Sequence, residues 1–374
     1  MTEKSSGSGL NSFTPDWISP PGDTVLDLLE EREWSQQELA ARLGYSTKHV
    51  NQLIKGHVPL SEEAAVRLHS VLGGSVGFWL TREAQYREQM ALQEEARSFS
   101  AMVPWLEKFP VKELMDLGAL PKCRLDKEGK RRLVGDLLAF FGVASPAQWE
   151  AHYGSMEVAF RRSREDQADI AAISAWLRLG EREAEKQDGP RYDGALFKAS
   201  LGLIRSWTTL SAGEFGPKLT STLSSCGVTL VLVPALPRSH VSGVARWLNP
   251  HRPLIQLSLY GKTNDRFWFS FFHEAAHILL HGNQKKAVFL DDPGKSGSQS
   301  AEEQEANEWA RDWLISPESA VHLRSLPHTK AAVRHFAKTI GIHPGIVVGQ
   351  MQHDKLLSVS WLNDLKDGFA FVNS

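Results

Sequence analysis

The segment FFHEAAHILLHG, residues 271–282, constrains the fold of this chain more than any other feature, because it contains the pattern His-Glu-x-x-His. His273 and His277 are four positions apart, so an α-helix of 3.6 residues per turn brings both imidazoles to one face. Glu274 then lies beside the water of an ion that the two histidines bind. Because apolar residues surround the motif, the pattern predicts a core helix over residues 264–280 that carries a metal site.

A catalytic zinc ion needs a third protein ligand and one open position for water. We expect this ligand on the acidic segment 301–317, which follows the motif and is predicted to be helical from 302 to 314. Glu303 is favoured over Glu305, because Asn307 lies one turn after Glu303 and can support a ligand imidazole. The pattern also predicts that four neighbours face the core: Ala306, Trp309, Ala310 and Trp313. His281 is a further alternative, but a four-residue step turns about 40° and carries its side chain away from the ion.

The pattern of apolar residues changes from helical to extended near Cys226. Helical spacing before this point predicts several helices, among them 130–141 and 168–185. β-Branched runs at 227–234, 243–248 and 253–258 then predict a small sheet before the motif helix. The strand 254–258 is a candidate for accepting an extended substrate by strand addition, with an ordinary core strand as the alternative.

This organisation predicts a predominantly helical α+β protein in four parts. They are a flexible arm (1–22), a helix-turn-helix domain (23–92), a helical middle region (93–225) and a C-terminal domain with the metal site (226–374).

Residues 34–73 have the layout of a helix-turn-helix. Ser35 with Glu38 forms a capping box, Gly44 permits a tight turn, and Ser46 and Ser61 begin the next two helices. Six apolar residues would form the small core: Leu39, Ala40, Leu43, Val50, Leu53 and Ile54. The polar residues left facing outward suit a DNA major groove: Gln36, Thr47, Lys48, His49, Asn51, Gln52 and Lys55.

The charge of this segment is the feature that opposes DNA binding. Residues 23–90 contain seven Lys or Arg and ten Asp or Glu. The stretch 46–57, however, carries Lys48, His49, Lys55 and His57 and no acidic residue, which indicates a local positive face. A helical module that docks another protein is the alternative.

Three C-terminal segments, NDRFWFSFFHEAAHILLHG, EEQEANEWARDWLISP and GIHPGIVVGQMQH, resemble the ImmA/IrrE family of zinc metallopeptidases over roughly the last 150 to 180 residues. The resemblance implies a zincin-like α+β fold, a Zn²⁺ cofactor and a protein substrate, commonly a repressor whose cleavage relieves transcriptional silencing. By position it makes His273, His277 and Glu303 the metal ligands and Glu274 the catalytic carboxylate. Ser316 stands where the family often has Met or Pro, which concerns packing rather than chemistry.

Residues 20–90 resemble the Cro/repressor type of helix-turn-helix, particularly antitoxin regulators of the HigA kind. The resemblance rests on SPPGDTVLDLLEEREWSQQELAARLGYSTKHVNQLIKG and on the TREAQY that follows GFWL. It implies a double-stranded DNA operator as a partner. Repressor modules often bind as dimers on two half-sites, so it also allows a homodimer.

The composition of the whole chain limits where it acts. Lys plus Arg (42) nearly balance Asp plus Glu (44), so no global field draws the chain to nucleic acid or to a membrane. The two cysteines, Cys123 and Cys226, indicate a reducing compartment, and no apolar run reaches the roughly 20 residues of a membrane span. We therefore expect a cytoplasmic protein.

Together these features predict a DNA-binding transcriptional regulator whose zinc endopeptidase domain cleaves a partner protein, a repressor or a toxin–antitoxin partner, under stress or mobile-element control. One alternative is a non-enzymatic, antitoxin-like regulator whose metallopeptidase-like domain is a sensor or binding module. Another is a protease whose helix-turn-helix recruits the substrate. Intact Glu274 favours cleavage, because a sensor needs no general base. No residue is assigned to stabilise the oxyanion; Tyr260, His343 and His353 are candidates, with a structural role as the alternative for each.

Overall fold

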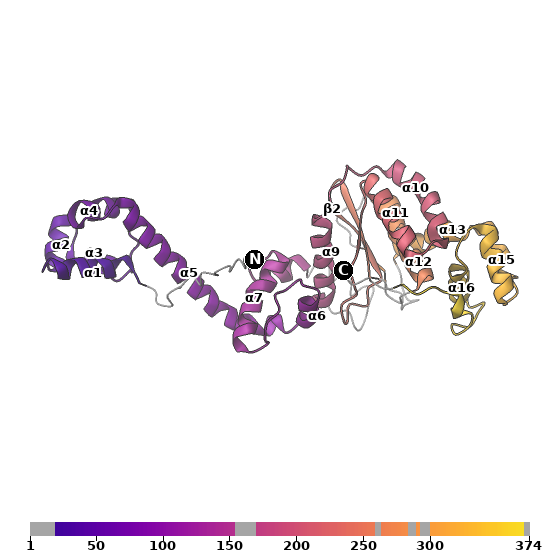
Figure 1. The fold of residues 1–374 in the computed structure, drawn as a ribbon, viewed down its shortest axis with the longest axis horizontal. Helices are drawn as coiled ribbons and strands as arrows, with labels where there is room; N and C mark the ends of the chain where they lie inside the picture. Colours follow the sequence, from indigo (N-terminus) through magenta and orange to yellow (C-terminus); the bar gives the residue numbers. More distant parts are fainter. Residues whose placement is uncertain (1–18, 154–169, 259–262, 283–288, 292–299, 370–374) are drawn as a thin grey trace, which may run out of the picture. The chain divides into compact units, whose positions relative to one another are not determined.

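The computed structural model describes residues 19–153, 170–258, 263–282, 289–291 and 300–369 (Figure 1). Contacts between residues divide the chain into two compact units, 1–102 and 103–374, and the division falls inside helix α5 (Val76–Leu106). Positions 1–18 of the expected flexible arm lie outside the described residues, and helix α1 (Pro21–Glu31) already begins within that arm.

The first unit consists of α1, α2 (Gln36–Leu43), α3 (Thr47–Ile54), α4 (Glu62–Leu72) and the beginning of α5. The predicted N-caps are present, since the hydroxyls of Ser35, Ser46 and Ser61 each accept a hydrogen bond from the N–H three residues later at 3.1–3.2 Å. Only half of the expected capping box forms, because the carboxylate of Glu38 pairs with Arg42 at 2.8 Å.

A single apolar core holds these helices together. It confirms the predicted core residues, all of which are buried: Leu39, Ala40, Leu43, Val50, Leu53 and Ile54. Gly44 ends α2 in the left-handed region (φ 71°), which a glycine adopts without strain. The resulting tight turn packs α3 against α2 and leaves the polar face of α3 outside the core.

The second unit continues with α6 (Val111–Asp116), α7 (Lys127–Phe141), α9 (Ile170–Glu185), α10 (Gly194–Ser206), η1 (Trp207–Thr209) and α11 (Ala212–Ser225). Around α7, aromatic rings form a cluster with centroids 4.9–6.5 Å apart: Trp105, Phe109, Phe141, Trp149 and Tyr153. Edge-to-face and tilted ring contacts of this kind stabilise a small helical core.

The sheet contains β1 (Thr229–Leu232), β2 (Gly243–Asn249), β3 (Arg252–Leu257) and β4 (Phe289–Asp291) in the order β1-β3-β2-β4. β1 and β3 are parallel, and β2 is antiparallel to β3 and to β4. The three predicted strands are present, and β4 was not expected. Of the two interpretations of strand 254–258, the structure supports the ordinary core strand and excludes strand addition, because β3 lies between β1 and β2 and both of its edges are already paired.

Helices cover both faces of the sheet. On one face lies α9, which accepts a hydrogen bond from Gln256 at the Trp176 carbonyl (2.7 Å) and pairs through Glu181 with Arg246 of β2 (2.6 Å). On the other face lie α11 and α12 (Asn264–Leu280), as Figure 1 shows. The sheet is therefore a buried platform that fixes α12 in place.

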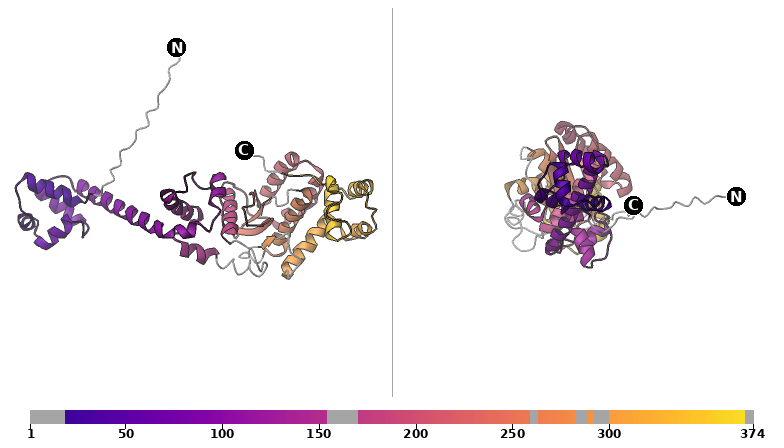
Figure 2. Two further views of the ribbon diagram at one scale, coloured as in Figure 1. Left: turned by 90° about the horizontal axis from the view of Figure 1, so that it is seen from below. Right: turned by 90° about the vertical axis from the view of Figure 1, so that its left-hand side faces the viewer.

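The C-terminal part adds α13 (Ala301–Leu314), α14 (Pro317–Arg324), α15 (Lys330–Ile340), α16 (Pro344–His353) and η2 (Asn363–Leu365). Figures 1 and 2 show α15 and α16 (yellow) at the end of this unit opposite to α7 and α9. One core joins α10, α11, the sheet, α12 and these helices. Residues on both sides of the expected 225/226 boundary therefore share one core.

Candidate metal centre and DNA-binding surface

Helix α12 carries the His-Glu-x-x-His motif and has the bounds predicted from the sequence, 264–280. Its apolar residues Trp268, Phe271 and Phe272 are fully buried, so the helix lies within the core between the sheet and α13. Burial includes the motif itself, since His273, Glu274 and His277 are at most 1 % exposed. Polar side chains at such depth require polar or ionic partners.

Glu303 of α13 meets the two motif histidines. Its Oε2 lies 3.2 Å from Nε2 of His273, its Oε1 lies 3.5 Å from Nε2 of His277, and the two Nε2 atoms are 3.0 Å apart. Three ligands at zinc distances in a tetrahedral arrangement are about 3.3 Å apart. The donor set and its spacing therefore fit a divalent metal ion held by two imidazoles and one carboxylate.

The protonation states of these groups also suit a metal ligand set. Burial lowers the pKa of His277 to about 4, against the opposing effect of Glu303, so this imidazole is neutral at pH 7. Burial raises the pKa of Glu303, but hydrogen bonds from His273 and His277 outweigh it and bring the pKa down to about 2. A neutral imidazole and an ionised carboxylate are the forms that bind a metal.

Glu274 lies against the first residue of β2. A Cβ atom built on Gly243 would be 2.6 Å from Oε1 of Glu274, which is closer than side chains approach one another. The glycine therefore leaves room for this carboxylate in its present position between α12 and the sheet, and a larger residue would displace it. Sequence reasoning missed this role of Gly243, because nothing in its neighbourhood marks a glycine that touches a residue 31 positions later.

Glu305 and His281, the two alternative ligands, pair with each other outside the His/His/Glu group. Nε2 of His281 lies 3.0 Å from Oε2 of Glu305, and Nδ1 of His281 lies 3.0 Å from Nδ1 of His277. The structure thus brings Glu303, and not Glu305, to the two motif histidines.

The candidates for stabilising an oxyanion fare differently. Tyr260 lies outside the described residues. His343 accepts a hydrogen bond from Asn264 (2.5 Å) in the first turn of α12. Asn264 lies nine residues, or about 13.5 Å of helical rise, before His273, so this hydrogen bond holds His343 at the other end of the helix from the motif. His353 is exposed at the end of α16 and pairs with Asp354.

The predicted DNA-reading residues lie on α3 and at the start of α2. Thr47, Lys48 and Lys55 are exposed, and the other four are half-buried: Gln36, His49, Asn51 and Gln52. Asn51 donates a hydrogen bond to Gln36 (3.2 Å), which fixes the first turn of α2 against α3. His49 packs edge-on against Tyr45, with ring centroids 4.7 Å apart.

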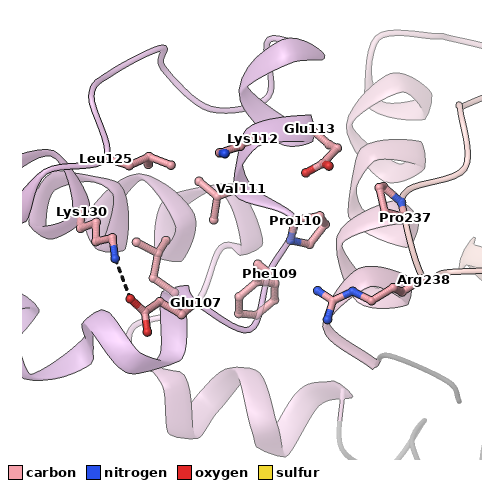
Figure 3. Close-up of a pocket in the computed structure, with 11 residues that line it drawn as sticks. Glu107, Phe109, Pro110, Val111, Lys112, Glu113, Leu125, Lys130, Pro237 and Arg238 are labelled. Carbon is pink, nitrogen blue, oxygen red and sulfur yellow. Dashed lines mark hydrogen bonds and ion pairs between the residues drawn. The ribbon is translucent and has the colours of Figure 1, made fainter.

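A separate cavity of about 360 Å³ lies in the second unit, between the α5–α7 region and the loop at Pro237 and Arg238 (Figure 3). Phe109, Pro110 and Val111 form part of its apolar wall, and the rim carries charges of both signs, including a Lys130–Glu107 pair at 2.6 Å. None of the predicted site residues lines it.

Comparisons with known families match two segments of the chain. Residues 25–79 match the model of a helix-turn-helix family, and residues 232–344 match the model of the Peptidase_M78 family, the IrrE N-terminal-like domain. No curated protein matches the chain. Within the described residues, every helix is too short or too polar to cross a membrane. The chain therefore contains one segment that is similar to helix-turn-helix domains of the Cro/C1 type and a second that is similar to metallopeptidase-like domains of the IrrE/ImmA type.

Proposed function

We propose that this protein is a DNA-binding regulator whose C-terminal domain is a zinc-dependent endopeptidase that cleaves a partner protein. The convergence of His273, His277 and Glu303 beside Glu274 carries this proposal. In this arrangement three residues serve as ligands for one ion, and a fourth, the carboxylate after the first histidine, serves as the general base.

The chemistry assigns a separate role to each group. When bound, zinc brings the pKa of a ligand water towards about 7 and polarises the scissile carbonyl. Glu274 accepts the proton of the attacking water and passes it to the leaving amine. Gly243 leaves room for the Glu274 carboxylate on the sheet side of α12, and Glu303 supplies one negative charge toward the two positive charges of the ion.

The helix-turn-helix would bring this activity to a DNA operator. We propose that Gln36, Thr47, Lys48, His49, Asn51, Gln52 and Lys55 contact the operator, that the protein binds it as a homodimer, and that the substrate is a repressor or a toxin–antitoxin partner. The outward polar face of α3 supports the first statement, because exposed lysines at both ends of a helix can reach phosphates on either side of a groove. Free Cys123 and Cys226 support a cytoplasmic location.

The decisive experiment compares the zinc-loaded wild type with the variant Glu274→Gln. Each is incubated with the purified products of neighbouring genes, and fragments are identified by mass spectrometry. We expect a fragment with the wild type only, and an equal zinc content in both proteins. Glu308→Gln alters an exposed residue of α13 and is the matched control; this variant should cleave at the wild-type rate.

Two results would contradict the proposal. One is cleavage by Glu274→Gln at the wild-type rate. The other is the absence of bound zinc from the wild type and from Glu308→Gln after purification without chelators. A wild type that binds zinc and these proteins but cleaves none of them would instead support the non-enzymatic regulator.

A further inference from the structure

A row of hydrogen bonds leads away from the metal centre on the side opposite to the ion. It runs from Nδ1 of His277 to Nδ1 of His281 (3.0 Å), and from Nε2 of His281 to Oε2 of Glu305 (3.0 Å). His277 and His281 are almost fully buried, at 1 % and 7 % exposed, whereas the carboxylate of Glu305 reaches the surface. The row therefore connects a buried ligand to a surface charge.

The position of each proton in this row follows from the metal. Nε2 of His277 faces His273 and Glu303 and must carry no proton if it is to bind an ion. The proton of this neutral imidazole then lies on Nδ1, which donates to Nδ1 of His281. The proton of His281 must consequently lie on Nε2, where it donates to Glu305.

We infer that His281 and Glu305 are positioning residues for the metal ligand His277. This inference rests on the metal role proposed above. It gives His281 and Glu305, the two alternatives to Glu303 as third ligand, a role other than metal binding. His281 selects the tautomer of His277 and holds its ring with Nε2 toward the ion. Glu305 does the same for His281. An acceptor behind a ligand imidazole also raises the basicity of that imidazole.

The geometry excludes His281 as a fourth ligand. Its Nδ1 faces the rear of the His277 ring rather than the space between the two Nε2 atoms, and its Nε2 faces Glu305. The location at the end of α12 explains this orientation. His281 is the first residue after the helix, and its backbone N–H still donates to the carbonyl of His277, so the two rings stay adjacent with centroids 5.2 Å apart.

The test measures the affinity of the full-length protein for Zn²⁺ in competition with a chromophoric chelator. His281→Phe keeps a ring and removes the acceptor, and we expect the affinity to fall about 10- to 100-fold. Glu305→Ala removes an exposed partner, whose side chain is 61 % exposed, and should cost about two- to fivefold. Glu308→Ala, exposed on the same helix, should leave the affinity unchanged.

Two further readouts separate positioning from other roles. Co²⁺ bound to His281→Phe should show the same visible absorption as Co²⁺ bound to the wild type, because the ligand set is intact. The double variant His281→Phe/Glu305→Ala should lose no more affinity than His281→Phe, because Glu305 acts only through His281. If His281→Phe does not fold, Glu305→Ala measured against Glu308→Ala carries the test by itself.

Three results would overturn the inference. They are wild-type Zn²⁺ affinity in His281→Phe, an altered Co²⁺ spectrum in that variant, and an affinity of Glu305→Ala equal to that of Glu308→Ala. Failure of the metal site itself would look different, because His277→Ala would then bind Zn²⁺ as tightly as the wild type.

Discussion

Replacement of Gly243 by alanine tests whether the position of the Glu274 carboxylate limits catalysis. A new Cβ would lie 2.6 Å from Oε1 of Glu274 and 2.9 Å from Cδ2 of Leu257. To reach an ordinary contact of about 3.4 Å, the carboxylate oxygen must move by about 0.8 Å. A displacement near 1 Å in a reacting group costs about 100-fold in rate, so we expect turnover to fall about 10- to 100-fold.

The same substitution should leave the metal and most of the stability intact. The overpacking penalty starts at about 1 kcal/mol, and the smaller entropy of an unfolded chain with alanine in place of glycine returns about 0.4–1 kcal/mol. The two closest atoms, Oε1 of Glu274 and Cδ2 of Leu257, are both at the ends of flexible side chains, so the free energy of unfolding should fall by no more than about 1 kcal/mol. Zinc content should be that of the wild type, because the atoms nearest to the new Cβ belong to Glu274 and Leu257 and not to a proposed ligand.

The assay is the rate of fragment formation from the protein substrate that wild type cleaves and Glu274→Gln does not, together with zinc content and thermal unfolding. Gly202→Ala is the matched control, because its new Cβ on α10 meets nothing within 4 Å. Wild-type turnover in Gly243→Ala would refute the claim that this contact places the carboxylate. Loss of zinc in Gly243→Ala would refute the claim that Glu274 can move without disturbing the metal ligands.

Three other perturbations follow from the structure. In the metal-free protein the pKa of His277 is about 4, below the unfolded value of about 6.5, so between these pH values only the unfolded chain takes up a proton as the pH falls. The free energy of unfolding should therefore fall by up to about 1.4 kcal/mol per pH unit between pH 6.5 and 4. Chemical denaturation at each pH would measure this slope, which should be smaller in His277→Gln. Replacement of Lys48 or Lys55 by Gln should reduce the slope of log affinity for operator DNA against log salt by about 0.9 per phosphate contact, whereas Lys338→Gln on α15 should not; equal slopes in all three would remove these lysines from the interface. Ser46→Ala removes the acceptor for the His49 N–H and should destabilise the first unit by about 1 kcal/mol in denaturant titration; an unchanged midpoint would mean that water replaces the cap.

Local signals in the sequence were sufficient for most of the secondary structure. Each of these elements depends on residues that are close to one another in the sequence, so the sequence alone can predict it. They are the motif helix, the three longer strands and the caps at Ser35, Ser46 and Ser61. Strand β4 was missed because three residues are too few to show a periodicity. The short reach of these interactions also explains why one face of α12 could be assigned to His273 and His277.

Local sequence patterns left two questions open, and the packing of the elements answered both. Whether β3 offers a free edge depends on which strands flank it, and two do. Whether Glu303 or Glu305 meets the histidines depends on how α13 is rotated against α12. The burial of Ala306 and Ala310 against α12 turns Glu303 inward and sends Glu305 to His281.

The sequence by itself therefore determined which side chains could bind an ion and which helix carries two of them, because spacing along a helix is a local property. Only the tertiary structure decided which distant carboxylate joins the two histidines, which glycine makes room for Glu274, and which two residues follow His277 in the row of hydrogen bonds. These choices come from the packing of elements that are far apart in the chain, and packing is settled by the whole core rather than by any one segment.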